Sequence, residues 1–530
     1  MEVIFFGSQP AILDQAQWIS SLYCEQLPFT TVTRSRLHVY FITNAHEVDT
    51  INPSRGENAS HILCFVGTTP KDVEWSDAII YLEDQDPTEI SRTVQSVFGG
   101  SYFYERLSRS VGQFPFGSGL MTEEVTRLSV PDLQRSHYYQ PLRDTMQKLI
   151  QEGLDSFAFP GAQLLVLHDG EIAVMSSYGF HTYEKARPVT NTDLYDMASI
   201  TKVTTATPAL MHLYDQKKID LDKSLCTYFP VLCNSNKADV SLREVLAHQG
   251  RLQPYIVYWQ NTLRKSGKYR SRTFKKRMSS RFPIKITEEL FLHRKYKRKI
   301  DKAIVNSPLN ENPGYIYSGL TFLLFPELVK ELTGERIDSF LYKYFYHPLG
   351  AQRLTYRPND HFAMNEIIPT EVDTVFRRQL VHGYVHDEAA AMLDGLSTNA
   401  GLFGNALDLG KLCQMLLNSG SYGGEQFISP ETLQEFTRYQ FPEQGNRRGL
   451  GFDKPLLEYK EGASYVARSA SPESYGHSGF TGTFFWVDPQ NKTVFILLTN
   501  RVYPTRANTK LYRMGLRPRL HQAIYDFLDQ

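Results

Sequence analysis

The sequence predicts two layered folds in one chain, a small N-terminal α/β domain followed by a larger α+β domain with an antiparallel sheet flanked by helices. Three observations lead to this prediction. The chain has 530 residues, which is too long for one ordinary domain. Its first 115 residues alternate short apolar runs with amphipathic segments. The remaining sequence carries β-hairpin signals near both ends, with helical patterns between them.

The N-terminal domain is expected at residues 1–115. Apolar runs predict its strands, and segments with helical apolar spacing predict its helices. The strands are expected at 38–43, 61–67 and 78–83, and the helices at 11–26 and 87–100. Residues 116–137 contain Gly and Pro without sustained periodicity, so we expect a linker that runs over the surface.

The larger domain is expected at residues 138–530 and begins with an amphipathic helix at 138–154. Two β-rich runs then meet at Asp169-Gly170, a strong hairpin signal. A second hairpin is expected at 482–500, turning at 488–491, and a terminal helix at 517–530. We therefore expect an antiparallel sheet built from both ends of the domain, with a helical region beside it.

Composition narrows the function classes. The 57 Lys and Arg residues equal the 57 Asp and Glu residues, which argues against a nucleic-acid-binding protein at the level of the whole chain. No apolar stretch reaches membrane-spanning length. The first residues show no signal peptide, so we expect a cytoplasmic protein. A longer precursor, a periplasmic location and the oligomeric state stay open.

The five cysteines, Cys24, Cys64, Cys226, Cys233 and Cys413, are scattered and contain no Cys-x-x-Cys pair. We expect them to be reduced and mostly buried, with a Cys226–Cys233 bridge as the less favoured alternative.

Residues 264–302 are dense in Lys and Arg, with only Glu288, Glu289 and Asp301 to offset them. The favoured interpretation is a solvated, mobile insertion. The alternative is a basic lid that attracts an acidic substrate or surface.

Ser199 and Lys202 form a Ser-x-x-Lys pair at a predicted loop-to-helix junction. Residues three apart on a helix lie on one face, so this lysine could accept the serine proton. The free N–H groups at a helix start would face a developing oxyanion. A serine helix cap is the structural alternative. Pro208 interrupts the helical pattern and should bend or restart the helix.

Two later segments could complete a site. Tyr317 and Ser318 precede a long apolar run, predicted to be helical, that ends at Gly334. A tyrosine there could move protons, although most tyrosines are core residues. His477, Ser478 and Gly479 lead into a strand, where glycine would let a substrate approach closely. The next amide, that of Phe480, could serve as an oxyanion donor.

In this order, the three segments resemble the serine β-lactamase and penicillin-binding-protein superfamily, whose elements are Ser-x-x-Lys, Tyr-x-Asn and Lys-Thr-Gly. The closest likeness is to the class C-like, β-lactamase-related serine hydrolases, many of which have His-x-Gly as the third element. Residues 240–255 and 399–412 are similar to two further segments of that family. The resemblance covers roughly residues 140–530 and implies a β-lactamase/transpeptidase-like fold.

The resemblance also implies residue roles. Ser199 would be the acylated nucleophile and Lys202 its base. Tyr317 would relay protons, and His477 would take the electrostatic, substrate-facing role of the family lysine. The amides of Ser199 and Phe480 would form the oxyanion hole. Substrate contacts are expected from Ser318, Ser478 and Gly479, and neither a metal nor another cofactor is implied.

Gly319 departs from the family pattern, because Asn or Asp usually stands there. The missing side chain puts β-lactam turnover in doubt more than acyl transfer. The expected function is a serine hydrolase acting through an acyl-enzyme on an ester or amide, with a peptidoglycan-derived peptide or other D-amino-acid compound as substrate. The alternatives are a carboxylesterase or weak β-lactamase, and a catalytically inactive binding or sensor protein.

The N-terminal domain is similar, at residues 77–100, 117–119 and 126–128, to the C-terminal α/β domain of family 3 glycoside hydrolases. The barrel that would hold a glycosidase nucleophile is missing, so we expect a structural remnant or docking surface without glycosidase activity.

Three further histidines are weighed as structural residues. His382 and His386 lie four residues apart beside Asp387, but no third ligand at a telling spacing accompanies them. His248 is expected to anchor a loop by hydrogen bonds.

Overall fold

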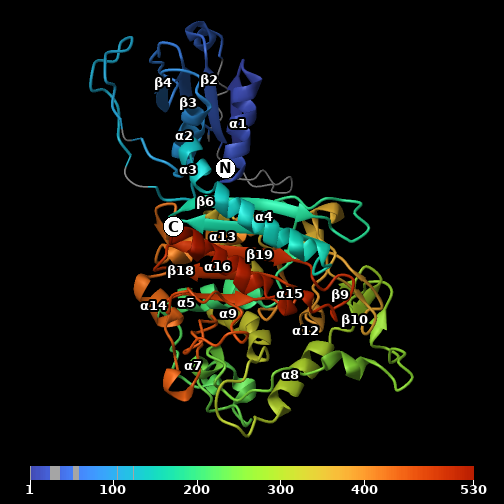
Figure 1. Ribbon diagram of the computed structural model, residues 1–530. Coiled ribbons are helices and arrows are strands. Elements are labelled where there is room, and N and C mark those ends of the chain that lie inside the picture. Colours follow the sequence, from blue (N-terminus) through green and yellow to red (C-terminus); the bar gives the residue numbers. More distant parts are fainter. Residues whose placement is uncertain (1, 24–35, 52–58, 104, 123–124) are drawn as a thin grey trace. The chain divides into compact units, whose positions relative to one another are not determined.

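The computed structural model describes residues 2–23, 36–51, 59–103, 105–122 and 125–530. Its chain divides into two units (Figure 1). The first contains the described residues up to Tyr138 together with Gly170–Ile172, and the second contains Tyr139–Asp169 and Ala173–Gln530. Cys24 lies outside the described residues.

The first unit contains a parallel sheet in the order β1-β2-β3-β4. Its strands are β1 (Glu2–Gly7), β2 (Arg36–Ile42), β3 (Ala59–Val66) and β4 (Ala78–Leu82). The helices are α1 (Pro10–Ser21), α2 (Pro87–Phe98) and α3 (Leu133–Tyr138). The predicted α/β layers are confirmed, whereas β1 was not predicted and α3 lies where we expected a linker.

Local chemistry sets the ends of α2. The Asp86 side chain accepts a hydrogen bond from the Thr88 N–H, and Pro87 occupies the first turn. Gly99 ends the helix in the left-handed conformation, with φ of 80°. Val94 and Phe98 of this helix line the same small void as Val39 of β2, which places the helix on one face of the sheet.

The second unit is built around a five-stranded sheet in the order β17-β18-β19-β5-β6, and the pairs from β17 to β5 are antiparallel. The N-terminal part of the unit supplies β5 (Gly161–His168) and β6 (Glu171–Gly179). Its C-terminal part supplies β17 (Tyr475–Ser478), β18 (Phe484–Asp488) and β19 (Thr493–Thr499). Both predicted hairpins are confirmed.

Helices cover both faces of this sheet. On one face, α4 (Gln140–Asp155) and α16 (Leu516–Leu528) share a core with Leu164, Trp486 and Leu497. On the other, α13 (Ala406–Leu417) packs so closely that a Cβ on Gly410 would lie 2.4 Å from Leu165 Cδ2. Leu164 and Leu165 therefore point to opposite faces, as the two-residue period of a strand requires.

Pro208 does not break the helix that follows Ser199. A π-helical turn, Lys202–Ala206, passes into α5 (Thr207–Asp215), which has Pro208 in its first turn. Proline has no N–H for the carbonyl of Thr204, four residues earlier, and the Tyr346 hydroxyl donates to that carbonyl at 2.8 Å. The chain stays helical through Pro208 and does not restart there, and the irregularity in the helix is this π-helical turn.

The second unit also contains the helices α6 (Leu225–Tyr228), α7 (Leu242–Leu246), α8 (Tyr296–Asn306), α9 (Phe325–Thr333), α10 (Ile337–Leu341), α11 (His347–Leu349), α12 (Glu388–Ala391), α14 (Pro430–Thr437) and α15 (Lys510–Arg513). One smaller sheet has the order β8 (Phe274–Lys275), β10 (Leu290–Leu292), β9 (Ile284–Thr287), and another has the order β11 (Thr355–Tyr356), β14 (Leu402–Gly404), β7 (Tyr195–Asp196). Two-stranded sheets pair β12 (Glu371–Asp373) with β13 (Gln379–Val381), and β15 (Ser421–Tyr422) with β16 (Glu425–Gln426).

The cysteine prediction is corrected at one pair. Cys226 and Cys233 form a disulfide, because the turn after α6 brings their Cα atoms to 4.5 Å. Cys64 and Cys413 are free and buried, as predicted. Disulfides persist mainly in oxidising compartments, so this pair weighs against the cytoplasmic location, which stays a prediction.

The basic segment is not structureless. Residues 264–302 form the β8-β10-β9 sheet and much of α8, with Ile286, Leu292 and Ile300 buried. The interpretation of this segment as a mobile insertion is therefore replaced by a folded excursion with a small apolar core. Within the described residues, no helix is both long and apolar enough to cross a membrane.

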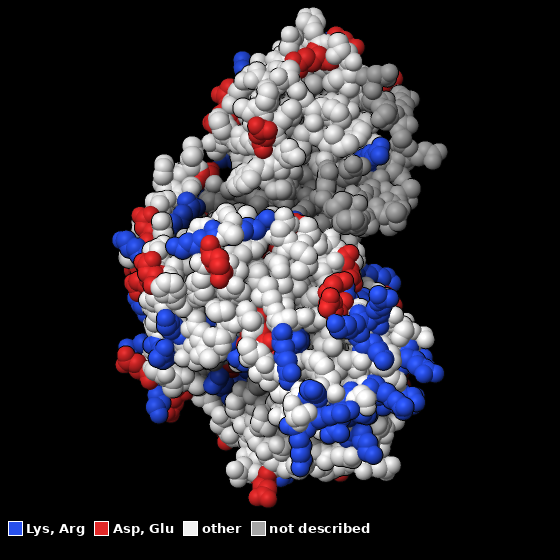
Figure 2. Space-filling model, turned by 90° about the vertical axis from the view of Figure 1, so that its right-hand side faces the viewer, with Lys and Arg blue, Asp and Glu red and all other residues white. Residues whose placement is uncertain are grey.

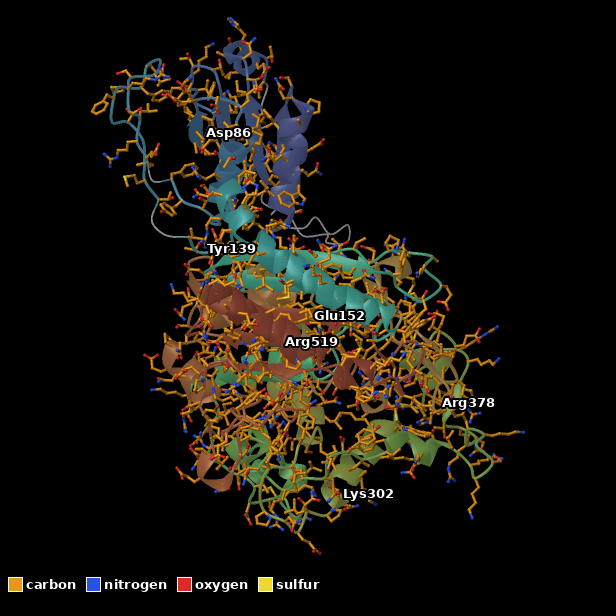
Figure 3. The ribbon with its side chains drawn as sticks, in the orientation of Figure 1. Asp86, Tyr139, Glu152, Lys302, Arg378 and Arg519 are labelled. Carbon is orange, nitrogen blue, oxygen red and sulfur yellow. A yellow bond between two sulfur atoms is a disulfide. The ribbon has the colours of Figure 1, made fainter. Side chains whose placement is uncertain are left out.

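Packing of α16 on the sheet predicts a stability difference between neighbouring positions. Leu520 is fully buried, whereas Arg519 forms a half-exposed ion pair with Glu152 of α4 (Figure 3). Leu520→Ala should lower the free energy of unfolding by about 2–5 kcal/mol. Arg519→Ala should change it by less than about 1 kcal/mol. Denaturant unfolding compares the two, and equal effects would contradict this packing.

Candidate active site

The turn before Ser199 is fixed from both sides. β7 pairs with β14, and the Met197 N–H donates to the Leu402 carbonyl at 3.0 Å. The Asp196 carboxylate accepts from the Ala198 N–H at 2.8 Å, while Ala198 has a φ of 46°. This left-handed turn ends the strand and places the partly exposed Ser199 immediately before the helix.

Lys202 lies against Ser199, as the Ser-x-x-Lys spacing predicts. Its Nζ donates to Ser199 Oγ at 2.9 Å and to the carbonyl oxygen of Asn399 at 2.9 Å. The ammonium also lies 5.3 Å from the centroid of the Tyr317 ring and 5.6 Å from that of Phe322. Lys202 is only 2% exposed, so these contacts hold its nitrogen at the serine.

Tyr317 lies in a loop and not at a helix start. A 3-10 turn, Thr321–Leu323, separates it from α9, so the predicted helix begins later than expected. The Tyr317 ring packs on His248 with centroids 4.5 Å apart. The His248 carbonyl accepts from the Ile316 N–H, and its Nδ1 accepts from the Ser318 N–H. His248 is therefore a loop anchor, as predicted.

Ser318 is corrected from a substrate contact to a structural residue. It is 4% exposed, and its hydroxyl donates to the Gln253 carbonyl at 2.7 Å. The same oxygen accepts from the Leu320 N–H at 3.3 Å. This buried hydroxyl is bonded to two backbone groups and so holds the Tyr317 loop.

Gly479 brings the end of β17 against the serine turn. A Cβ at this position would lie 2.0 Å from Thr483 Oγ1, 2.6 Å from the Met197 carbonyl oxygen and 3.2 Å from Ala198 Cβ. Only glycine fits this approach without movement. The Thr483 hydroxyl also donates to the Met197 carbonyl at 3.1 Å, which ties the two turns together.

The two amides predicted to form an oxyanion hole flank this contact. Among the described residues, no acceptor is hydrogen-bonded to the N–H of Ser199 or of Phe480. Ser478 is partly exposed at the same edge, and its carbonyl contacts His477 Nδ1 at 2.8 Å. Two free N–H groups beside a nucleophile are the arrangement that stabilises a tetrahedral oxyanion.

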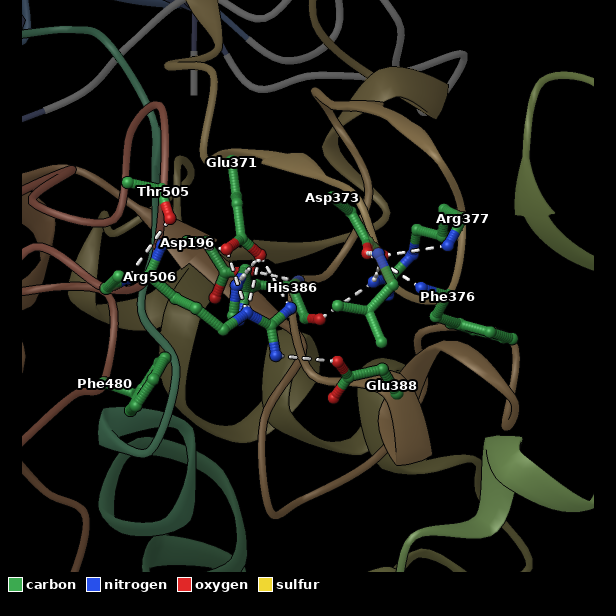
Figure 4. Close-up of polar contacts among 12 residues, drawn as sticks. Asp196, Glu371, Asp373, Phe376, Arg377, His386, Glu388, Phe480, Thr505 and Arg506 are labelled. Atoms are coloured by element: carbon green, nitrogen blue, oxygen red, sulfur yellow. Dashed lines mark hydrogen bonds and ion pairs between the residues drawn. The ribbon is translucent and has the colours of Figure 1, made fainter. Parts of the chain in front are cut away.

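A polar network supports this edge of the site (Figure 4). His386 Nε2 contacts the Glu371 carboxylate at 2.8 Å, and the His386 N–H donates to Asp196 at 2.6 Å. Arg506 pairs with Glu371 at 2.6 Å and with Glu388 at 2.9 Å. The His386 ring also stacks on Phe480, with centroids 5.7 Å apart. The network thus joins the strand before Ser199 to Phe480.

The hydrogen bonds and ion pairs of this network determine the pKa of Glu371. Burial acts to raise the pKa of Glu371, but hydrogen bonds from His386 and Arg506 outweigh it and hold that pKa at about 2. His382 Nε2 contacts the Ile367 carbonyl at 2.7 Å. Because each imidazole is committed to a protein acceptor, His382 and His386 are structural residues, as predicted.

His477 is neutral, which differs from the charged role expected of it. Burial lowers its pKa to about 3, and the nearby cations Arg448 and Lys202 act in the same direction. Its ring packs near Tyr317 with centroids 6.0 Å apart, and its Nε2 is buried without a hydrogen-bond partner in the described part of the chain. A neutral, buried imidazole cannot replace the charge of a lysine.

Arg448 is the cation that sequence analysis missed. It is 1% exposed, and its guanidinium carbon lies 5.7 Å from the centroid of the Tyr317 ring. Asp453 balances it at 3.3 Å and also pairs with Arg447. Sequence offered one weak signal, two adjacent arginines in a glycine-rich stretch, residues 446–451.

Comparison with known proteins identifies the family of this chain. The Beta-lactamase family profile matches residues 146–517. The chain belongs to the Beta-lactamase family. The matched range begins after the first unit, so the resemblance of that unit to family 3 glycoside hydrolases stays a prediction.

Two curated relatives of this family member are bacterial. An N-acetylmuramyl-L-alanine amidase of Bacillus subtilis is 30% identical over 378 residues, which cover 65% of this chain and 77% of the relative. A protein of Escherichia coli O157:H7 named "Putative D-alanyl-D-alanine carboxypeptidase" is 28% identical over 404 residues, covering 70% of this chain and 86% of the relative.

Solved structures confirm the β-lactamase/transpeptidase-like fold. A penicillin-binding protein homologue from Caulobacter crescentus has a TM-score of 0.52 at 16% identity, covering 73% of this chain and 97% of that one. A β-lactamase/D-alanine carboxypeptidase from Pseudomonas syringae has a TM-score of 0.51 at 15% identity, covering 72% and 99%. EstCE1, a hydrolase with promiscuous acyltransferase activity, scores 0.51 at 16% identity, covering 72% and 99%.

Buried neutral histidines predict that acid destabilises the second unit. Burial lowers the pKa of His477 and of His521 to about 3, against an unfolded value of about 6.5. Between these values the unfolded chain binds protons that the folded chain does not, so stability falls as pH drops below about 6.5. Denaturant unfolding at several pH values measures this.

The His521→Asn variant isolates one of these protons. His521 lies in the core, where its Nδ1 accepts from the Ala467 N–H, away from the site. The variant should lose up to about 1.4 kcal/mol per pH unit of the pH dependence. A pH dependence identical to that of the wild type would contradict a neutral, buried His521.

Proposed function

We propose that this Beta-lactamase family member is a serine hydrolase that forms an acyl-enzyme at Ser199, with peptides that end in D-alanine, such as those of peptidoglycan, as its substrate class. The observation that carries the proposal is the 2.9 Å hydrogen bond between Lys202 Nζ and Ser199 Oγ, in a site that buries the lysine. The name of the Escherichia coli relative supports a substrate that ends in D-alanine, and the name of the Bacillus subtilis relative supports a peptidoglycan source.

Acylation follows from this geometry. As the base, Lys202 takes the Ser199 proton when Oγ attacks the substrate carbonyl. The N–H groups of Ser199 and Phe480 stabilise the oxyanion that develops. The carbonyl of Asn399 holds Lys202 Nζ at the serine while the proton is transferred.

Proton delivery is assigned to Tyr317. Its ring lies beside both Lys202 and His477, which supports a relay of the proton from the lysine to the leaving group through the tyrosine hydroxyl. Water then attacks the acyl-enzyme, and the same groups act in reverse. His477 acts as a neutral imidazole, and Arg448 supplies the fixed positive charge near the tyrosine.

Labelling of the serine tests the mechanism. A fluorescent phosphonate or a penicillin should add to Ser199, detected by intact mass and peptide mapping. The Ser199→Ala variant should lose the adduct and at least about a thousandfold of the hydrolysis rate. Ser280→Ala, which changes an exposed serine in the basic segment, should behave like the wild type.

Substrates are compared in the same assay with p-nitrophenyl esters, nitrocefin and peptides that end in D-alanine. No adduct with either probe in folded protein would support the alternative of an inactive binding protein. Hydrolysis of the esters alone would support a carboxylesterase, and turnover of nitrocefin alone a β-lactamase.

Gly319 leaves room for the side chain that is usual in the family. A Cβ there would meet only ordinary contacts, at 3.8 Å from Asn399 Cβ and 3.9 Å from Lys202 Cε. We expect Gly319→Asn to fold and to raise the rate of acylation by nitrocefin relative to an ester. One added hydrogen bond of about 1 kcal/mol corresponds to about a fivefold change.

The matched control is Gly319→Ala, which adds the Cβ without the amide. It should leave the ratio of the two rates unchanged. An unchanged ratio in folded Gly319→Asn, measured by stopped-flow acylation, would contradict this account of the substrate preference.

A further inference from the structure

A folded excursion separates the two loops that carry His248 and Tyr317, and it concentrates the positive charge of the chain. Arg251 and Asn310 close its base, because the Asn310 N–H donates to the Arg251 carbonyl at 2.8 Å and Arg251 Nε donates to the Asn310 carbonyl at 2.7 Å. Residues 252–309 therefore leave and re-enter the fold beside the site.

The net charge of the whole chain does not reveal the charge of this excursion. Residues 264–302 contain 16 Lys and Arg against 3 Asp and Glu, an excess of 13 positive charges. Because the whole chain has zero net charge, all other residues together carry 13 excess negative charges. Figure 2 shows Lys and Arg side chains crowded over one face of the second unit, with few acidic side chains among them.

Fourteen of these cations are exposed, and none of the fourteen forms an ion pair with a described residue. They are Arg264, Lys265, Lys268, Arg270, Arg272, Lys275, Lys276, Arg277, Arg281, Arg294, Lys295, Arg298, Lys299 and Lys302. The other two, Lys285 and Lys297, are partly buried and pair with Glu288 and Asp301. We call the fourteen residues the basic surface.

The positive charge of the basic surface affects the pKa of a histidine within the same segment. Desolvation is the largest effect that lowers the pKa of His293. Four neighbouring cations lower it further, among them Lys295, Arg294 and Arg281. Like charges held this close repel one another, and none of the fourteen has an ion-pair partner among the described residues. A polyanion would relieve that repulsion and release its own counterions on binding.

The excursion is folded firmly enough to hold these charges in place. The Tyr269 hydroxyl donates to the Phe376 carbonyl at 2.6 Å, and Arg378 donates to the Gly267 carbonyl at 2.6 Å. The Lys285 N–H donates to Asp394 at 2.9 Å. These contacts join the excursion to residues 376–394, which immediately precede Asn399, the residue that holds Lys202.

We propose that the basic surface binds an extended polymer with repeating phosphate groups and holds it beside the active site. Seven of the fourteen cations are arginines, whose planar guanidinium matches phosphate oxygens in pairs. The charges are spread over sheet, loop and helix, so they suit a chain of anions better than one small ion.

Exposed side chains favour such a polymer over a membrane or a single-stranded nucleic acid. In residues 264–302, all of which the structure describes, Met278 is the one exposed large hydrophobic residue. Membrane insertion uses several apolar side chains, and single strands stack their bases on exposed aromatic rings. The basic surface offers charge without either feature.

Binding is tested in the Ser199→Ala background, so the result does not depend on the proposed hydrolysis. Inorganic polyphosphate is titrated against the protein at low and physiological salt by fluorescence anisotropy. Binding should weaken steeply with salt. The basic-surface variant Lys275→Gln, Lys276→Gln, Arg277→Gln and Arg281→Gln should bind at least about tenfold more weakly.

A matched control removes the same charge elsewhere. Lys148, Lys218, Lys223 and Lys330 are exposed outside the excursion, and replacing all four with Gln should change the affinity less than about twofold. Equal losses in both variants would overturn the site, because they would show only an effect of net charge. So would absence of binding at low salt in folded protein.

Two competitors decide the class of ligand. Vesicles of phosphatidylcholine with phosphatidylglycerol and a single-stranded oligonucleotide are titrated at equal phosphate concentration. Tighter binding of either than of polyphosphate would overturn the proposal in favour of a membrane or nucleic-acid surface. Weaker binding of both would support it.

Discussion

The candidate site depends on a backbone approach that leaves no room for a side chain. Gly479, at the end of β17, lies against the Met197 carbonyl and the turn before Ser199. This contact brings a strand from the C-terminal part of the chain to a helix start almost 300 residues earlier. The nucleophile, the second oxyanion donor and the sheet edge are thereby fixed in one place. A residue larger than glycine would separate them.

Around that contact, the buried charged and neutral side chains leave Lys202 as the residue placed to act as the base. Lys202 and Arg448 are buried, and His248 and His477 are buried and neutral. Asp453 compensates Arg448, whereas Lys202 is held by a carbonyl and a hydroxyl. These two neutral oxygens keep the Lys202 nitrogen at Ser199, where the proposed mechanism needs it.

The same unit separates its charge on a larger scale. An excursion with a small apolar core carries the positive excess, and the remaining chain carries an equal negative excess. Both ends of the excursion join the loops of His248 and Tyr317, beside the site. Substrate preference at this site therefore need not follow from the net charge of the protein.

Much of the fold could be predicted from local patterns. Alternating apolar residues and an Asp-Gly turn predicted β5, β6, β18 and β19, and apolar spacing predicted α4 and α16, because these signals lie within each segment. The start of α9 was predicted too early, since apolar residues at 320–324 also suit a 3-10 turn. β1 was missed, although it is no shorter than β4, which was predicted.

The sequence by itself determined the order of the chemical groups, because Ser199 and Lys202 share a helix and their spacing alone places them together. Only the tertiary structure decided which other groups reach them. Arg448, Asn399 and the neutral state of His477 depend on burial and on contacts between segments far apart in the chain, for which no local pattern exists. The role of Ser318 changed for the same reason, since its partners at His248 and Gln253 lie about 65 to 70 residues away.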